Sequence, residues 1–472
     1  MIQVYKPHDT TIRLLGTPGI NPGEKYRELK FLLKYEVERG LLIYNVLTRE
    51  LILLSHEEKE IFENPTDITN EIVVGLIKKW VLVPEKTDEV AISKQIYSFL
   101  SNFFFSNTNP IHIFTIFPTT ACNARCFYCF ENGRTQTFMS PQTAEDVADF
   151  IIKKSKGVPI KIRWFGGEPL YNSQVIDIIC DKLIAAGVKF NSHVTTNGYL
   201  FTPDIIEKAV NKWNISAGVQ ITLDGTEEIY NKVKNFIYTD GRSAFQVVLE
   251  NIGNLVKAGV KVSIRLNMDE HNAEDLYKLS DILYERFGQY KNFIVYVHLL
   301  FEDSSKVQLE RSDIERHMLL NKYLQFSEYL AGQYKRQSKN VQSLMQYHQC
   351  MADDPATTTI LPDGSLGKCE HYSDTDFWGS IYSDEINMDA INEFRRLQDL
   401  GKQCEECELK PMCFRLVRCA QTVDRCDDAD KKLRLVHVGK LIMATYREFL
   451  DKEAGILKEG DNSDEIEVQS DC

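Results

Sequence analysis

The chain has 472 residues, of which 43% are hydrophobic, and its formal net charge at pH 7 is −13. This length allows about two to four domains with packed cores. The acidic balance argues against general nucleic-acid binding, which needs a basic surface. Because no run of about 18 apolar residues occurs, no membrane span and no membrane partner are expected.

The first 105 residues predict a small domain of their own. Short apolar runs separated by turn residues are typical of strands, and Gly40 lies in one of the turns. Ser55 and Glu58 have the spacing of a capping box, which opens a helix. Two further amphipathic runs follow. The expected strands cover residues 30–37, 41–47 and 50–54, and the expected helices begin at Ser55 and cover residues 69–80 and 91–102.

Between residue 111 and about residue 345, strand-like apolar runs alternate with amphipathic helical runs such as 144–156 and 202–213. This alternation is typical of a parallel sheet whose strands are connected by helices. Six such units fit a partial barrel, so the expected fold class is α/β with a partial (β/α)6 barrel of the TIM type. The expected strands cover residues 111–118, 160–166, 189–196, 217–224, 261–268 and 292–300.

Ten of the twelve cysteines fall into two groups, and the first group is Cys122, Cys126 and Cys129. Three thiolates within eight residues suit a four-iron cluster that keeps one iron open for a ligand. A structural zinc site is the alternative. Disulfides are not expected, because no apolar signal segment precedes the polar N-terminus and a reducing cytoplasm is the expected location.

The Cys-x3-Cys-x2-Cys spacing, with the aromatic Tyr128 before the last cysteine, resembles the signature of the radical SAM superfamily. The resemblance implies that S-adenosylmethionine (SAM) binds the open iron through its amino and carboxylate groups. It also implies cleavage of SAM to methionine and a 5′-deoxyadenosyl radical, which abstracts a hydrogen atom from a C–H bond. In such enzymes the cofactor carries the difficult step, and the protein positions the substrate and excludes water.

Residues 164–169, with the sequence Trp-Phe-Gly-Gly-Glu-Pro, resemble the Gly-Gly-Glu motif of the same superfamily. The resemblance implies that the backbone at Gly166 and Gly167 contacts the SAM amino group, with Glu168 as an acceptor for the ammonium. Under this interpretation, Gly166→Val weakens SAM binding and leaves the iron content unchanged.

Further polar residues stand at the ends of the later strands. Asn197 lies in a segment similar to those that place a polar side chain near the SAM ribose. Asp224 ends the next strand, and both it and Tyr128 are expected to bind the cofactor. Arg265 and Asn267 end the strand after that and are expected to hold the methionine carboxylate or the ribose. Barrel enzymes keep their sites at these strand ends. A role as a strand-end cap is the alternative for each residue.

The second group of cysteines resembles the SPASM domain, which carries two auxiliary four-iron clusters. The spacing of Cys350, Gly364 and Cys369 matches the start of that domain, and the next three cysteines match its middle. Five residues separate Cys413 from Cys419, and Cys426 follows soon after. Both spacings depart from the usual pattern, so the partition of the ligands between the two clusters is open. By analogy, the first auxiliary cluster takes Cys350, Cys369 and Cys419, and the second takes Cys404, Cys407, Cys413 and Cys426.

The N-terminal strands and helices resemble the RiPP recognition element, a winged-helix domain that binds the leader of a ribosomally made peptide. In that family the leader adds as a strand to a sheet edge, and residues 32–37 are the expected edge. Removing the domain is then expected to abolish peptide modification and to leave SAM cleavage intact. A structural cap on the barrel is the alternative. The expected divisions are 1–105 for this domain, 106–345 for the barrel, 346–430 for the SPASM domain, and 431–472 for a helix and an acidic, disordered tail.

Together these resemblances imply a radical SAM/SPASM maturase that forms an intramolecular thioether or carbon–carbon crosslink in a ribosomally made precursor peptide. The expected cofactors are three [4Fe-4S] clusters and SAM, and the expected electron donor is a flavodoxin or ferredoxin. Three alternatives stay open: an enzyme of the sulfatase-maturing type that oxidises Cys or Ser, a peptide epimerase, and a non-catalytic adaptor that binds zinc and peptide.

Overall fold

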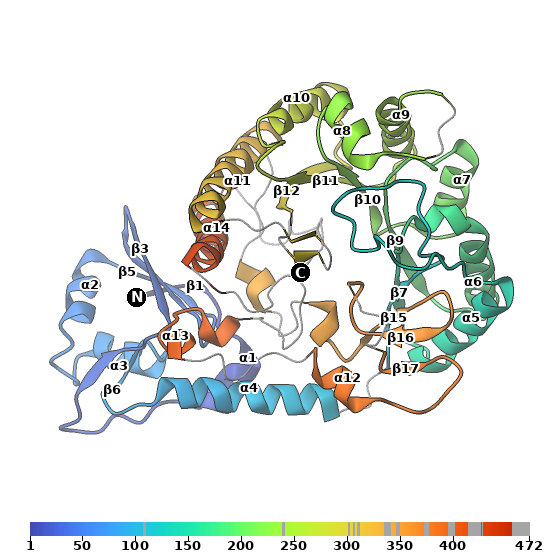
Figure 1. Ribbon diagram of the computed structural model, residues 1–472. Coiled ribbons are helices and arrows are strands. Elements are labelled where there is room, and N and C mark those ends of the chain that lie inside the picture. The colour runs from blue at the N-terminus through green and yellow to red at the C-terminus, as the bar shows by residue number, and fades with distance from the viewer. Residues whose placement is uncertain are drawn as a thin grey trace.

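Figure 1 shows a curved sheet with helices along its outer side and a smaller α/β region next to it. Cys419, Cys472 and the acidic tail that was expected to be disordered lie outside the described part of the chain. The computed structural model describes residues 1–106, 110–237, 241–300, 303–304, 307–308, 312–334, 341–345, 350–371, 377–394, 402–413, 426 and 428–455.

Six parallel strands form the barrel in the order in which they occur along the chain. The predicted partial (β/α)6 barrel is thus confirmed. The strands are β7 (Ile113–Ile116), β8 (Ile160–Trp164), β9 (Phe190–Thr196), β10 (Gly218–Leu223), β11 (Val262–Met268) and β12 (Phe293–Leu299). The helices that follow them are α5 (Pro141–Ser155), α6 (Ser173–Ala185), α7 (Pro203–Asn211), α8 (Glu227–Lys234), α9 (Ala244–Lys257), α10 (Asp275–Phe287) and α11 (Asp313–Tyr334).

Apolar residues stand at every second position of β8, where Ile160, Ile162 and Trp164 are buried and the two charged residues between them are partly exposed. Successive side chains of a strand point to opposite faces, so one face of β8 packs into the core. The register of β11 with β12 runs from Val262 opposite Phe293 to Met268 opposite Leu299. It places Asn267 beside His298 near the carboxyl ends of the two strands. The register therefore brings polar side chains of neighbouring strands together at this end of the sheet.

The start of the second cysteine group continues the barrel sheet. Strand β15 (Thr357–Ile360) pairs in parallel with β7, and β16 (Ser365–Gly367) and β17 (Gly379–Ser380) extend the sheet in antiparallel pairing. Gly364 turns the chain between β15 and β16 with a positive φ of 87°. Ile360, Leu366 and Trp378 belong to the same core as the barrel side chains. The proposed boundary at residue 345 therefore separates the two groups of cysteines in the sequence, but one hydrophobic core extends across it.

The N-terminal region holds a four-stranded sheet in the order β1-β5-β4-β3, and Ser55 and Glu58 form the predicted capping box. The first strand, the first helix and the pair β2–β6 were not predicted from the sequence. The elements are β1 (Ile2–Tyr5), α1 (Asp9–Leu15), β2 (Tyr26–Glu28), β3 (Leu32–Val37), β4 (Gly40–Asn45), β5 (Leu51–Leu54), α2 (His56–Glu63), α3 (Glu71–Lys78), β6 (Leu82–Pro84) and α4 (Glu89–Ser106).

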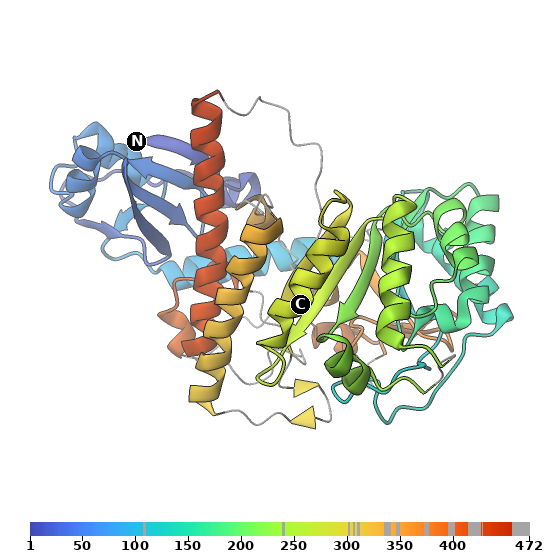
Figure 2. The ribbon, with the colours of Figure 1, turned by 90° about the horizontal axis from the view of Figure 1, so that it is seen from above.

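This sheet shares its core with the C-terminal end of the chain. Helix α14 (Asp428–Glu453) contacts β1, and its residues Val438, Leu441 and Ile442 are buried in the same cluster as β4 and β5. Figure 2 shows α14 running alongside the sheet. The remaining elements are η1 (Pro169–Asn172), β13 (Asp303–Ser304), β14 (Val307–Gln308), η2 (Val341–Met345), η3 (Met351–Asp353), α12 (Met388–Asn392), α13 (Lys402–Glu405) and η4 (Lys410–Met412).

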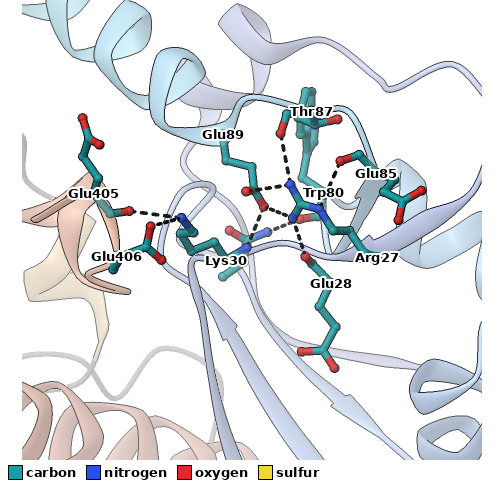
Figure 3. Close-up of polar contacts among 10 residues, drawn as sticks. Arg27, Glu28, Lys30, Trp80, Glu85, Thr87, Glu89, Glu405 and Glu406 are labelled. Atoms are coloured by element: carbon teal, nitrogen blue, oxygen red, sulfur yellow. Dashed lines mark hydrogen bonds and ion pairs between the residues drawn. The ribbon is translucent and has the colours of Figure 1, made fainter. Parts of the chain in front are cut away.

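Polar contacts tie the N-terminal region to the second cysteine group, as Figure 3 shows. The buried carboxylate of Glu89 accepts two hydrogen bonds from the guanidinium of Arg27, at 2.8 and 3.0 Å, and one from the backbone N–H of Lys30. The Lys30 ammonium donates to the carbonyl oxygen of Glu405 and to the side chain of Glu406, both at 3.2 Å. Those two glutamates separate Cys404 from Cys407 in the sequence.

None of the helices in the described ranges has both the length and the apolar composition that a membrane span needs.

Candidate active site

The polar residues singled out from the sequence meet at one end of the barrel. Cys122 lies in the loop after β7, Glu168 after β8, Asn197 after β9 and Asp224 after β10, and Asn267 lies near the end of β11. Because the six strands are parallel, these positions share the carboxyl edge of the sheet.

Backbone hydrogen bonds from the end of α8 hold the loop that carries the three cysteines. The N–H of Arg125 donates to the carbonyl oxygen of Lys234 at 2.8 Å, and the N–H of Ile237 donates to the carbonyl oxygen of Asn123 at 2.9 Å. The Arg125 guanidinium also donates to the carbonyl oxygen of Cys122 at 2.7 Å. These bonds position the loop without using the cysteine side chains.

Burial raises the pKa of all three thiols in this loop. The pKa of Cys122 and of Cys129 is raised to about 12, and the pKa of Cys126 is raised as well. The main cause is loss of water around the sulfur, which disfavours the thiolate. A metal centre reverses this preference because its positive charge stabilises the thiolates that coordinate it. The three thiols therefore fit an iron–sulfur cluster, whose irons would supply that charge.

Gly166 and Gly167 allow the chain after β8 to lie directly against the chain that leads into Cys122. A Cβ atom on Gly166, which has a φ of +129°, would lie 2.3 Å from the carbonyl oxygen of Thr119. A Cβ atom on Gly167 would lie 2.4 Å from the carbonyl oxygens of Thr120 and Ala121. The glycines thus permit a close contact between two backbone segments, whereas the sequence led us to expect a close approach to a ligand.

Glu168 is fully buried and joins the ends of β8 and β9. Its carboxylate accepts hydrogen bonds from the Thr196 hydroxyl at 2.8 Å, from the Asn197 backbone N–H at 2.9 Å and from the Leu170 backbone N–H at 3.1 Å. Burial raises the pKa of this carboxyl to about 7, although the three hydrogen bonds act in the opposite direction. The expected role of Glu168 as an acceptor for the SAM ammonium stays a prediction.

Asp224 and Tyr128 bind each other, and a third residue that sequence reasoning missed binds both. The Tyr128 hydroxyl donates to the Asp224 carboxylate at 2.9 Å and accepts from the Lys234 ammonium at 2.9 Å. Lys234 also forms an ion pair with Asp224 at 2.9 Å, and the side chains of Lys234 and Asp224 are 4% and 1% exposed. Tyr230 and Lys234 are the buried residues of α8. The sequence signal for a buried Lys234 is its position four residues after Tyr230, which places both side chains on the same face of the helix.

Asn267 and Asn197 join the same polar layer. The Asn267 side-chain amide donates to the Asp224 carboxylate at 3.2 Å, and its oxygen accepts from the Arg265 guanidinium at 3.0 Å. The Asn197 amide donates to the side-chain oxygen of Asn123 at 2.7 Å and lies 3.7 Å from the Cys122 sulfur. The layer therefore extends from the cysteine loop to the end of β11.

The structure brings Cys350 and Cys369 together in a small apolar cluster with Phe394. Cys350 is disulfide-bonded, which is an alternative to iron ligation for this sulfur. Among the described residues, no group of three or more His, Cys, Asp or Glu side chains is placed to hold a single metal ion. In a four-iron cluster each thiolate binds a different iron. Cys404 lies in α13, Cys407 lies between α13 and η4, Cys413 directly follows η4, and Cys426 precedes α14.

Residues 116–283 match the family model described as the Radical SAM superfamily. The match runs from the end of β7 into α10 and includes the loop with all three cysteines of the first group. The chain therefore contains a radical SAM domain, as the resemblance of its motifs implied.

Curated relatives are similar to a part of the chain. The radical SAM cyclopropyl synthase TigE of Paramaledivibacter caminithermalis is 28% identical over 140 residues, which cover 24% of this chain and 29% of TigE. The GTP 3′,8-cyclase of Microcystis aeruginosa is 27% identical over 187 residues, which cover 36% of this chain and 53% of the cyclase. An uncharacterised protein of Methanocaldococcus jannaschii is 30% identical over 123 residues, 25% of this chain and 41% of that protein. The chain thus spans only part of the length of each of these relatives.

Solved structures resemble a larger part of the chain. The structure of anSMEcpe with bound AdoMet and the Cp18Cys peptide has a TM-score of 0.52 and 16% identity, and it covers 73% of this chain and 100% of that one. Streptococcus suis SuiB bound to the precursor peptide SuiA has a TM-score of 0.50 and 14% identity, and it covers 84% of this chain and 100% of that one. At these identities the similarity shows the fold alone.

Proposed function

We propose that this chain is a radical SAM maturase that modifies a ribosomally made precursor peptide. The observation that carries the proposal is the contact between the two cysteine-bearing loops at the carboxyl end of the radical SAM barrel. The ring of Phe130, which follows Cys129, lies 4.5 Å from the ring of His371, which follows Cys369 by two residues. A second redox centre at Cys369 would therefore lie next to the SAM site.

Cys122, Cys126 and Cys129 would hold the SAM cluster. When bound, this cluster and SAM supply a radical that abstracts a hydrogen atom from a substrate C–H bond. The backbone at Gly166 and Gly167, which lies against the chain leading into Cys122, is proposed to contact the SAM amino group. Asn197, Arg265 and Asn267 are proposed to contact SAM, with the planar guanidinium of Arg265 suited to a carboxylate.

Crosslinking of the peptide needs an electron acceptor. After hydrogen abstraction, closing a bond from the substrate carbon to a neighbouring thiol or aromatic ring releases one proton and one electron. The second cysteine group is proposed to hold two auxiliary [4Fe-4S] clusters that would accept this electron. A flavodoxin or ferredoxin in the cytoplasm is the proposed donor of the electron that SAM cleavage consumes. The proposed ligands are Cys350, Cys369 and Cys419 for one cluster and Cys404, Cys407, Cys413 and Cys426 for the other.

The N-terminal region is proposed to bind the leader of the precursor peptide on β3. This strand is at the edge of the four-stranded sheet, and no described strand pairs with its outer side. An edge strand offers backbone N–H and C=O groups to an incoming extended chain. Both similar structures are complexes with a peptide, Cp18Cys in one and SuiA in the other, which supports the proposal of a peptide substrate here.

Metal analysis tests the proposal against the zinc-binding adaptor. Anaerobically reconstituted protein is expected to hold about twelve irons, as three four-iron clusters. Replacing Cys122, Cys126 and Cys129 by alanine should leave roughly eight irons and abolish the production of 5′-deoxyadenosine. Because Cys350 is disulfide-bonded in the structure, reduction before reconstitution is part of the experiment. Stoichiometric zinc without iron would contradict the enzyme proposal.

The mass and the fragmentation of the peptide product together distinguish the remaining alternatives. A thioether or carbon–carbon crosslink removes two hydrogen atoms. Oxidation of Ser to formylglycine also removes two hydrogen atoms but joins no residues, so the peptide still fragments fully. Oxidation of Cys to formylglycine removes sulfur and two hydrogen atoms and adds one oxygen. Epimerisation leaves the mass unchanged in water and adds one deuteron in deuterated solvent. The proposed crosslink therefore predicts a peptide lighter by two hydrogens that resists full fragmentation between the joined residues.

A further inference from the structure

A buried ion pair lies directly beneath the cysteine loop. Lys234 and Asp224 are almost completely shielded from water, and their side chains meet at 2.9 Å. Burying two charges is costly unless both are paired and hydrogen-bonded. Here the Tyr128 hydroxyl bonds to both charged groups, and the Asn267 amide donates a further hydrogen bond to Asp224. This ion pair joins the segment between Cys126 and Cys129 to the end of β10. A buried pair at this position suggests a role beyond filling the core.

Tyr128, Asp224 and Lys234 connect the cysteine loop to the rest of the barrel domain at two points. Tyr128 lies between Cys126 and Cys129 in the sequence, and its hydroxyl reaches the end of β10 at Asp224. The carbonyl oxygen of Lys234 accepts the backbone N–H of Arg125. Movement of Lys234 or Asp224 would therefore displace the segment that carries Cys126.

The two charges lie beside the segment that carries the cysteines, because the hydroxyl of Tyr128, between Cys126 and Cys129 in the sequence, bonds to both of them. Lys234 further lies over the ring of Tyr128, with 5.6 Å between the ammonium and the ring centre. The potential of an iron–sulfur cluster depends on nearby charge, hydrogen bonds to its sulfurs and exposure to water. A buried cation favours the more negatively charged, reduced cluster, and a buried anion disfavours it.

We propose that Tyr128, Asp224 and Lys234 form a positioning unit that fixes the Cys122–Cys129 loop and sets the reduction potential of the cluster bound there. This inference rests on the proposed iron–sulfur function of the loop. In this unit the Tyr128 hydroxyl and the Asp224 carboxylate bind the Lys234 ammonium and each other.

The potential of the cluster whose electron paramagnetic resonance signal changes on addition of SAM tests the charge effect. Lys234→Met is expected to shift this potential to more negative values, and Asp224→Asn to more positive values. The double variant, which leaves no buried charge unpaired, should stay near the wild-type potential. Lys232→Met, which removes an exposed lysine from the same helix, is the matched control and should not shift it. The proposal would be overturned if the reduction potential shifted in the same direction in both single variants. It would also be overturned if the potential stayed unchanged in the two single variants and in the double variant.

Hydrogen exchange of the iron-free protein tests the positioning effect separately. Tyr128→Phe keeps both charges and removes only the hydroxyl. The backbone amide of Arg125 should then exchange about fivefold faster, because one hydrogen bond that anchors the loop is lost. Unchanged exchange would overturn the positioning role. Protein that binds no iron would contradict the proposed function, yet this exchange measurement would still decide whether the unit holds the loop.

Discussion

At the scale of single residues, the site is dominated by groups that bind other parts of the protein. Glu168, Asp224 and Tyr128 are polar and lie at the carboxyl edge of the barrel, which is why the sequence marks them as ligand contacts. In the structure their polar atoms are used by Thr196, Lys234 and the backbone. Buried polar groups need such partners, because an unmade hydrogen bond in the core is costly.

Glu168 makes stability depend on pH. Its pKa is raised from 4.5 to about 7 in the folded protein, so folding favours the protonated form. The resulting stabilisation is fully present below about pH 4.5 and is lost as the pH rises through about 7, with a total of about 3 kcal/mol at most. Glu168→Gln removes this dependence. Between pH 5 and pH 7.5 the free energy of unfolding of the wild type should therefore fall relative to that of the variant. Parallel pH profiles of the two proteins would show that the raised pKa is absent.

Gly166 is expected to control iron binding as well as SAM binding. In Gly166→Ala the new Cβ atom would meet the backbone oxygen of Thr119, so the chain leading into Cys122 must shift. The iron content should fall from about twelve toward about eight, together with a loss of stability of about 2 kcal/mol or more. Gly187→Ala is the matched control, because that position also has a positive φ but no atom within 4 Å of the new Cβ. An unchanged iron content in Gly166→Ala would restore the interpretation based on the sequence alone.

At the scale of elements, the orientation of β3 decides how its edge can be tested. Val37 lies opposite Gly40 across a two-residue turn, and such a turn closes with hydrogen bonds between the flanking residues. Hydrogen-bonded pairs alternate along an antiparallel ladder, so Tyr35 faces β4, whereas Lys34 and Glu36 present their backbone groups to the open edge.

Glu36→Pro is therefore the sharpest test of strand addition. Proline removes one backbone donor at the open edge, and the affinity for the precursor peptide should fall about tenfold while the fold is retained. Glu36→Ala is the control, because it removes the same side chain and its contact with Lys59 but keeps the donor. Binding constants measured for a labelled leader peptide give the comparison. Equal affinities of the two variants would argue that the leader does not pair with β3.

At the scale of the whole molecule, the N-terminal region and the C-terminal helix form one core. Val438, Leu441 and Ile442 of α14 are buried with the strands of the N-terminal sheet, and Tyr35 lies against Gly439. Across the same interface Lys30 contacts Glu405 and Glu406 (Figure 3). The interface is thus built mainly from apolar burial, since partly exposed ion pairs contribute little.

Deletion of residues 1–105 is expected to destabilise the rest of the protein. It would expose the apolar face of α14 and of η4 to water, and burial of each large apolar side chain contributes about 2 kcal/mol. The truncated chain should aggregate or unfold at a lower temperature, which light scattering and thermal unfolding measure. SAM cleavage by a stable truncated protein, with unfolding at the wild-type temperature, would show instead that the region is an independent module, as the sequence alone suggests.

The sequence alone determined the local features of this protein. Short strand-like runs between amphipathic helical runs predicted all six parallel strands to within a few residues, because the side chains on at least one face of each strand must pack into the core. Ser55 and Glu58 predicted the start of α2, because a capping box is completed within one helical turn. The spacing of Cys122, Cys126 and Cys129 likewise lies within one loop and is readable without the fold.

Only the tertiary structure decided which distant residues share an environment. Lys234 joins Asp224 and Tyr128 because α8 returns beside the cysteine loop, and no local pattern specifies that approach. The N-terminal sheet joins α14 across almost the whole length of the chain for the same kind of reason. Local propensity and periodicity act over a few residues, whereas burial depends on how the apolar faces of finished elements meet. The partners of a buried charge are therefore set by packing.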